Sequence, residues 1–177
     1  YYNLTITDVE RGSRYGGNIR VHVTKGKNKD ISENVAVMLN LEEESGLYKL
    51  ETYRKFADRV KKAKEDFTNL ILKVKQDGKT IVANSCPGRC VTLLNYYDVG
   101  VDLIPYITEQ PTSLKLGMFL PGKHIPVINN EMLIKEQPDY VILLAWHYAE
   151  PIMKQLKARG LKSTFVIPLP DLTVVEN

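Results

Sequence analysis

The sequence has few cysteines, little excess charge and no long apolar run. Its 177 residues include two Cys and one Trp, and the net charge is +3. Both cysteines, Cys86 and Cys90, lie in one loop, so a disulfide scaffold is excluded and a zinc site would need further ligands. No run approaches the roughly 18 apolar residues of a membrane span. The Lys residues are scattered, without the concentrated basic face that is typical of nucleic-acid-binding proteins.

These absences narrow the class of protein. Apolar residues make up 44% of the chain and charged residues 25%, which are ordinary values for a globular domain. Two thiols in one loop fit a reducing compartment. We therefore predict a cytoplasmic protein that has neither nucleic acid nor a membrane as a partner. The chain begins YYNLTI, without Met, and we expect it to be a piece of a longer protein.

Residues 1–27 predict a linking β-hairpin. The stretches LTITDV and NIRVHV alternate apolar and polar residues in the manner of strands. Gly16 and Gly17 stand between them and permit the positive φ of a turn. Residues 28–49 predict a polar linker and a short helix, VAVMLNLEEESG, which ends at Gly46.

The strongest periodic signal predicts a long helix that ends at Gly78. Its apolar residues recur at three-and-four spacing and form one stripe: Tyr53, Phe56, Val60, Ala63, Phe67, Leu70, Ile71 and Val74. Lys and Glu fill the other faces. The stripe favours packing against a sheet, and a coiled-coil dimer is the alternative.

After Gly78 the pattern changes to strands that alternate with helices. Strands are predicted near residues 80–83, 103–107, 141–146 and 163–167, with VTLLNYY, NEMLIKEQ and AEPIMKQLKARG as helices between them. This alternation predicts an α/β fold, namely a Rossmann-like three-layer domain with a mostly parallel sheet. The domain is expected over residues 50–177, after the hairpin and with the long helix at its start.

The predicted parallel sheet gathers three polar side chains at one edge. Loops at 84–90, 108–112 and 146–148 leave the carboxyl ends of strands, where ligands bind in open α/β sheets. Arg89 is suited to bind a phosphate, Glu109 ends the next strand where a ribose-binding acid would lie, and His147 follows the apolar strand. The alternative is that Arg89 is a solvated surface charge.

Other parts of the sequence contain few motifs that indicate a chemical activity. The first loop offers only Gly88, so a G-x-G-x-x-G dinucleotide motif is absent, as are a P-loop and a nucleophile elbow. His124 lies in FLPGKHIPVI, a loop framed by Pro and Gly, where it either contacts a substrate or holds the loop by bonding to its backbone.

Several stretches together resemble a known family. LEEESGLYKLETYRKFADRVKK, GKTIVANSCPGRCVTLLNYY and FLPGKHIPVINNEMLIKEQPDYVILLAWHYAEPI resemble the carboxyl-terminal domain of sugar C-methyltransferases that depend on S-adenosylmethionine. DVERGSRYGGNIRVHV resembles the segment that joins this domain to the methyltransferase domain. The resemblance runs in order along nearly the whole chain.

The resemblance implies a substrate-side domain that is not active alone. The family's substrate is a nucleotide-linked keto sugar, held between this domain and an upstream methyltransferase domain. S-adenosylmethionine is implied for the full-length enzyme, and none is expected to bind to this chain. By the resemblance, the substrate-binding residues are Gly16, Gly17, Arg89, Glu109, His124 and His147.

The sequence departs from the family pattern at three places. Tyr15 stands where the family has the His of His-Gly-Gly, so Tyr15 takes the catalytic position, although a Tyr that titrates near pH ~10 is a poor base. The loop Ser85–Cys90 replaces Gly-Ala-Pro-Ala-Lys-Gly and keeps one cation, Arg89. His147 replaces an Asn. These changes leave open a second hypothesis, a non-catalytic ligand-binding or protein-interaction module derived from such a domain.

Overall fold

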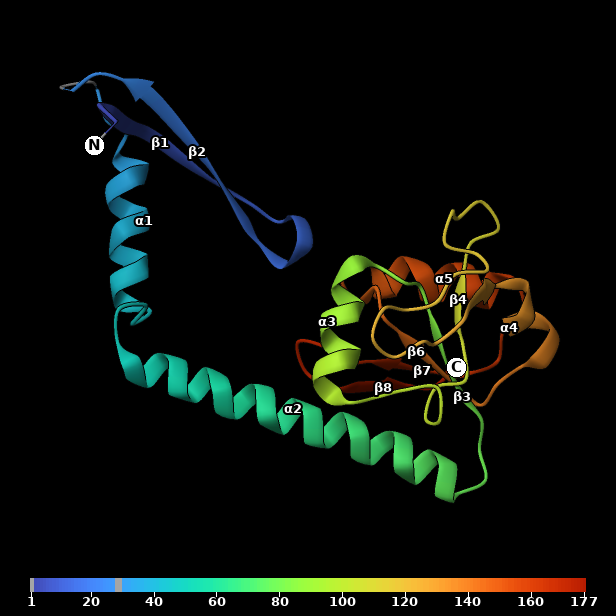
Figure 1. Ribbon diagram of the computed structural model, residues 1–177. Coiled ribbons are helices and arrows are strands. Elements are labelled where there is room, and N and C mark those ends of the chain that lie inside the picture. The colour runs from blue at the N-terminus through green and yellow to red at the C-terminus, as the bar shows by residue number, and fades with distance from the viewer. Residues whose placement is uncertain (1, 28–29) are drawn as a thin grey trace. The chain divides into compact units, whose positions relative to one another are not determined.

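A computed structural model describes residues 2–27 and 30–177, and the side chain of Tyr15 lies outside the described part. The chain forms two compact units, Tyr1–Asp58 and Arg59–Asn177. Helix α2 (Leu50–Gln76) begins in the first unit and ends in the second (Figure 1). Each unit is described by itself below.

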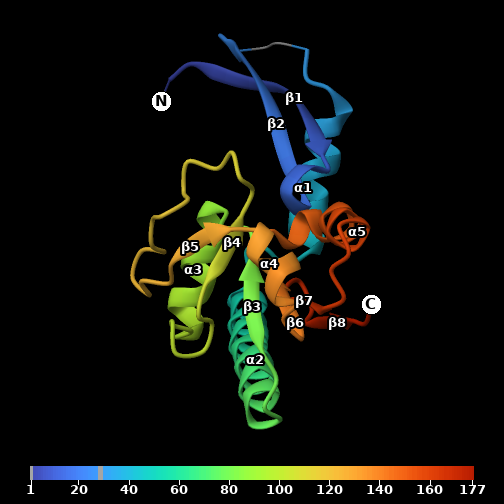
Figure 2. The same ribbon diagram turned by 90° about the vertical axis from the view of Figure 1, so that its right-hand side faces the viewer.

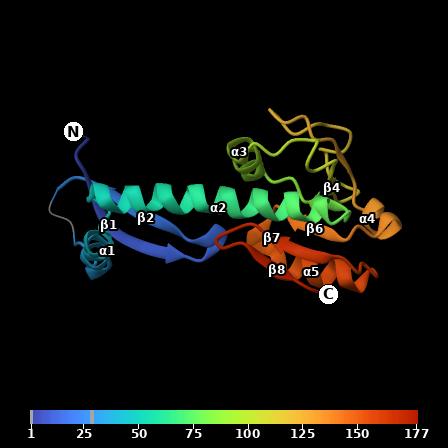
Figure 3. The ribbon, with the colours of Figure 1, turned by 90° about the horizontal axis from the view of Figure 1, so that it is seen from below.

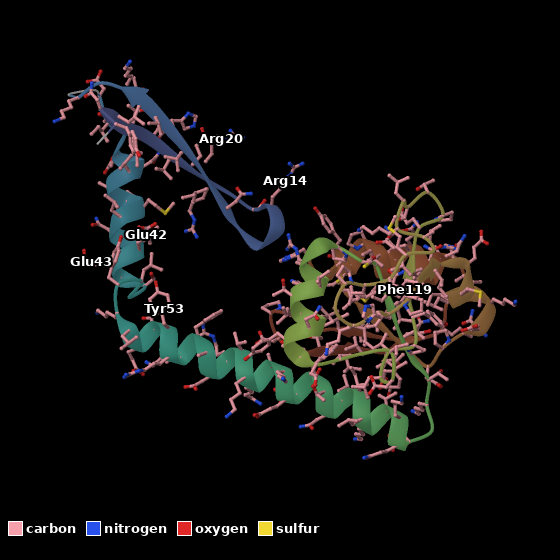
Figure 4. All side chains as sticks on the ribbon, viewed as in Figure 1. Arg14, Arg20, Glu42, Glu43, Tyr53 and Phe119 are labelled. Atoms are coloured by element: carbon pink, nitrogen blue, oxygen red, sulfur yellow. The ribbon has the colours of Figure 1, made fainter. Side chains whose placement is uncertain are left out.

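The first unit contains the hairpin that the sequence predicts. Strands β1 (Leu4–Gly12) and β2 (Asn18–Lys25) pair antiparallel, with an irregularity between Ile6 and Asp8. The 3₁₀ turn η1 (Arg14–Gly16) joins the strands, and Arg14 marks this end of the hairpin in Figure 4. Arg20 on β2 donates to Glu10 on β1, with 3.0 Å between Nη1 and Oε2.

Helix α1 (Glu33–Glu44) contacts β1, and hydrogen bonds join its amino end to that strand. The Ser32 hydroxyl caps the helix by accepting from the Asn34 N–H at 3.2 Å, and the Ser32 N–H donates to the Thr7 carbonyl at 2.8 Å. The Asn34 amide donates to Asp8 at 3.0 Å. The chain turns after the helix at Gly46, whose φ is +73°. The predicted short helix is therefore confirmed.

Only the second half of the apolar stripe on α2 is buried. Phe67, Ile71 and Val74 belong to the core of the second unit, whereas Tyr53 and Phe56 are exposed. The prediction that the stripe packs against a sheet is thus confirmed for its second half, which belongs to the unit that contains the six-stranded sheet. The predicted end is confirmed: Gly78 has a φ of +70°, and the Lys79 N–H donates to the Val74 carbonyl at 3.0 Å.

The second unit is built on a six-stranded sheet with the order β5-β4-β3-β6-β7-β8. The strands are β3 (Ile81–Asn84), β4 (Ile107–Glu109), β5 (Val127–Asn129), β6 (Tyr140–Leu143), β7 (Thr164–Ile167) and β8 (Thr173–Val175). The first five are parallel, and β8 runs antiparallel to β7.

Helices cover both faces of this sheet. They are α3 (Gly88–Tyr97), α4 (Glu131–Glu136) and α5 (Ala149–Ala158), together with the second half of α2. Ile81 and Ala83 face a core shared with α2 and α3, whereas Val82 faces a core shared with α4 and α5, as the two-residue period of a strand requires. Figures 2 and 3 show α3 and α5 on opposite sides of the sheet. The predicted Rossmann-like three-layer fold is therefore confirmed.

The strand boundaries required corrections. The predicted strand at 103–107 begins only at Ile107, because residues before Pro105 turn: the N–H groups of Leu103 and Ile104 both donate to the Gly100 carbonyl. The predicted strand at 141–146 ends at Leu143, and the 3₁₀ turn η2 (Trp146–Tyr148) follows it. Strands β5 and β8 were not predicted. Among the described residues no helix is both long and apolar enough to cross a membrane.

Candidate functional site

The candidate site lies where three neighbouring parallel strands end. Strand β3 is flanked by β4 and β6, so their carboxyl ends meet at one edge of the sheet. A buried hydrogen bond ties two of these ends together, since the Asn84 amide donates to the Thr108 hydroxyl at 2.9 Å. The Ser85 N–H donates to the Thr108 carbonyl at 2.7 Å, and Ser85 has a φ of +69°. The chain thus turns sharply at the end of β3.

Glu109 and Lys115 hold the loop that follows β3. The Cys86 N–H donates to Glu109 Oε1 at 2.7 Å, and the Cys86 carbonyl accepts from Lys115 Nζ. Lys115 Nζ also lies 3.7 Å from Glu109 Oε1. Both backbone polar groups of Cys86 are therefore bonded, and the predicted ribose-binding acid has one oxygen engaged in supporting the loop.

Helix α3 starts from this loop without a side-chain cap. Its N-cap is Pro87, which is extended, with φ −69° and ψ +155°, and has no side-chain acceptor. The first N–H groups of a helix then favour an anion at this end. A Cβ added at Gly88 would meet nothing within 4 Å, so space is open beside the first turn.

Arg89 lies against the turn that follows β6. Its guanidinium carbon is 5.8 Å from the centre of the Trp146 ring, which is within the range of a cation–π contact. The rings of Trp146 and His147 are 5.3 Å apart. Desolvation, followed by the positive charge of Arg89, lowers the pKa of His147 below its usual value. The neutral form of His147 is therefore favoured beside the Arg89 guanidinium.

Comparison with known proteins gives the family. A family model described as "C-methyltransferase C-terminal domain" matches residues 13–170. The chain belongs to this family. The C-methyltransferase NovU of Streptomyces niveus is 32% identical to it over 178 residues, which cover 98% of this chain and 42% of that protein. The chain thus spans less than half the length of this relative. The family resemblance of the sequence is confirmed.

The structure places His124 at the other edge of the sheet. It precedes β5, which runs parallel to β4, so it lies near the amino ends of the strands. It has a φ of +52°, and its N–H donates to the Leu120 carbonyl at 2.9 Å. The neighbouring Lys123 pairs with Asp98 at the end of α3. The fold therefore brings Arg89, Glu109 and His147 to one edge and leaves His124 apart from them.

The family match includes the turn that holds the remaining predicted residues. Gly16 and Gly17 have φ values of +87° and +119°, and the Gly17 N–H donates to the Arg14 carbonyl at 3.0 Å. The side chain of Tyr15 lies outside the described part, so its catalytic role stays a prediction. These residues belong to the first unit, and the roles of all the candidate residues in binding are likewise predictions.

Two features of the site were missed by sequence reasoning. Lys115 lies in a loop that showed no motif, and Trp146 was assigned to a strand. One signal was available for Trp146, since it directly precedes the candidate His147. No signal in the sequence pairs Lys115 with Cys86 or Glu109.

A separate group on the hairpin consists of Asp8, Glu10 and His22. It brings three potential ligand atoms within 4.8 Å of one another. Arg20 and Asn34 already bond to its carboxylates, so we assign no metal there.

Proposed function

We propose that this chain is the substrate-side domain of a cytoplasmic C-methyltransferase that uses S-adenosylmethionine. In this proposal a nucleotide-linked sugar binds at the edge formed by the carboxyl ends of β3, β4 and β6. The observation that carries the proposal is the Arg89 guanidinium beside Trp146, at the uncapped start of α3. An upstream methyltransferase domain of the same protein is the proposed partner.

The charges at this edge favour a phosphate group. The start of α3 offers backbone N–H groups and the positive end of the helix dipole. Arg89 adds a bidentate donor, and the Trp146 ring restricts where the guanidinium lies. Lys115 offsets the negative charge of Glu109. The open space at Gly88 lets a diphosphate approach the backbone closely.

The described residues of this chain do not fit S-adenosylmethionine. Its binding loop needs glycines that let the cofactor approach the backbone. Here Cys86 and Cys90 fill the loop with buried side chains, and Glu109 and Lys115 engage the Cys86 backbone. In this proposal the donor belongs to the upstream domain, where it supplies the methyl group.

Binding at the edge is tested by titrating the chain with nucleoside diphosphates and nucleotide-linked sugars while amide shifts are followed by NMR. We expect saturable shifts at 84–90 and 146–148. Arg89→Ala removes a charge-assisted contact and should weaken binding about tenfold or more. Lys135→Ala, which removes an exposed charge on α4, is the control and should bind like the parent chain.

The same titration separates the proposal from its alternative. Shifts that are unchanged in Arg89→Ala, or no saturable shifts at millimolar ligand, would reject the edge as a nucleotide site. That result would favour a protein-interaction module derived from the family.

The catalytic part of the proposal concerns Tyr15 with Gly16 and Gly17. We infer that this turn lies near the methylated carbon in the full-length enzyme, with Tyr15 moving the proton. Tyr15→Phe in that enzyme should lower turnover about 100-fold or more and leave nucleotide binding unchanged. Tyr48→Phe serves as the control, because Tyr48 is an exposed residue after α1. Full turnover in Tyr15→Phe would remove Tyr15 from the mechanism.

A further inference from the structure

The two cysteines of the chain face each other inside the loop after β3. Their Sγ atoms are 3.8 Å apart, and both residues are free thiols. Cys86 is 7% exposed and Cys90 is fully buried. The chain holds only these two cysteines. Neither side chain has a role in the nucleotide site proposed above.

The thiols enclose the start of α3. Cys86 precedes the Pro87 N-cap, and Cys90 lies in the first turn, where its N–H donates to the Pro87 carbonyl at 3.0 Å. A disulfide requires the sulfur atoms to approach to about 2.05 Å. Because Glu109 and Lys115 hold the Cys86 backbone, the approach must come from side-chain rotation and from the first turn of α3. Arg89 lies inside the ring that closes.

The surroundings shift the pKa values of the two thiols in opposite directions. The hydrogen bond from the Cys90 thiol lowers the pKa of Cys86, and the charge of Lys115 contributes in the same direction. That hydrogen bond and burial raise the pKa of Cys90. Since the thiolate is the nucleophile in thiol–disulfide exchange, the more accessible Cys86 reacts first.

We propose that Cys86 and Cys90 form a reversible dithiol–disulfide site that exchanges with low-molecular-weight disulfides and repositions Arg89. In the first step Cys86 loses its proton to solvent and its Sγ attacks one sulfur of the small disulfide, whose S–S bond breaks. This step leaves a mixed disulfide and releases one thiolate, which takes up a proton from solvent. Cys90 Sγ then attacks Cys86 Sγ, and its proton goes to the second departing thiolate. Both cysteines are oxidised, and the small disulfide is reduced to two thiols.

The disulfide changes the contact between Arg89 and Trp146. Closing the ring displaces the first turn of α3, and the guanidinium moves with it. Because Trp146 is the single Trp of the chain, its fluorescence reports this movement directly. Loss of one charge-assisted contact would also weaken nucleotide binding about tenfold. That second effect rests on the proposed function, whereas the disulfide and the fluorescence change do not.

The test incubates the chain with oxidised glutathione and counts thiols and bound glutathione by mass spectrometry. We expect the parent chain to lose two hydrogen atoms, to retain no glutathione and to change its Trp146 fluorescence, all reversed by a dithiol reductant. Cys90→Ala should retain one glutathione at Cys86, because no second thiol displaces it. Cys86→Ala should not react, because Cys90, unlike Cys86, has no exposed surface.

Three outcomes overturn the proposal. They are two intact thiols in the folded parent chain, a parent chain that stays at the mixed disulfide, and a disulfide that leaves Trp146 fluorescence unchanged. Circular dichroism establishes that each variant is folded. A disulfide with altered fluorescence in a chain that binds no nucleotide would support this site and reject only the proposed function.

Discussion

The two units of the chain differ in how they are stabilised. Among the described residues of the first unit, Val9 is the one buried apolar residue, and Ile6, Ile19, Val21 and Val23 on the hairpin are exposed. The second unit contains both core clusters. A two-stranded hairpin is marginal in water by itself. The comparison teaches that burial stabilises the second unit, whereas turn geometry, strand pairing and the contacts of α1 stabilise the first.

The strongest test of this difference is one apolar truncation in each unit. Ile142→Ala in β6 removes a fully buried side chain and should lower the free energy of unfolding by about 3 kcal/mol. Val21→Ala on exposed β2 should change it by less than about 0.5 kcal/mol. Denaturant unfolding followed by Trp146 fluorescence reports the second unit. Equal losses in the two variants would contradict the conclusion that burial distinguishes the two units.

The second test compares two glycines. Gly17 has a φ of +119°, which an L-residue rarely adopts, so Gly17→Ala should destabilise the hairpin by about 1–2 kcal/mol. Gly88→Ala is the control, because it has open space and no positive φ. Hydrogen exchange of the β1 and β2 amides should accelerate about tenfold in Gly17→Ala alone. Unchanged hydrogen exchange would show that the conformation of the turn does not limit the stability of the hairpin.

The third test concerns a polar contact in the second unit. Asp139 Oδ2 accepts from the Thr80 N–H at 2.8 Å and from the Thr80 hydroxyl at 2.7 Å, which joins the amino ends of β3 and β6. These bonds lower the pKa of Asp139 below 3.8. Their contribution to stability is therefore present above that pH and is lost as the pH falls below it.

Asp139→Ala should cost about 0.5–1 kcal/mol at pH 7, because the carboxylate is exposed. Denaturant unfolding between pH 7 and pH 2.5 measures the cost, and the difference from the parent chain should shrink at the acid end. Asp171→Ala, in the exposed segment before β8, is the control. A cost that does not change with pH would contradict the role of the Asp139 charge.

The smallest expected effect is at His147. Its pKa is lowered in the folded state, so the unfolded chain binds the proton more readily. The free energy of unfolding should decrease slightly as the pH drops below 6.5. His147→Asn should remove this part of the dependence of stability on pH. Unfolding at pH 8 and pH 5.5 measures the change, with His22→Asn as the control. Identical slopes in the parent chain and His147→Asn would show that His147 does not titrate differently on folding.

Local patterns predicted much of the fold. The alternation of apolar and polar residues and the pair Gly16–Gly17 predicted the hairpin. The spacing of Phe67, Ile71 and Val74 predicted α2. The strand–helix alternation gave the parallel sheet and hence the edge at which Arg89, Glu109 and His147 lie. Strand β8 has only three residues, and β5 lies within the His124 loop, so neither had a pattern long enough to detect.

The sequence by itself determined the hairpin, the helices and the parallel strands β3, β6 and β7, because the period of apolar residues and the positions of glycines act within a few residues of the chain. Only the tertiary structure decided the partners across the sheet: Glu109 on the Cys86 N–H, Lys115 on its carbonyl and Arg89 on Trp146. Each of these contacts joins residues more than 20 positions apart. Their geometry depends on strand order and register, which are fixed when the whole core packs and not by any one segment.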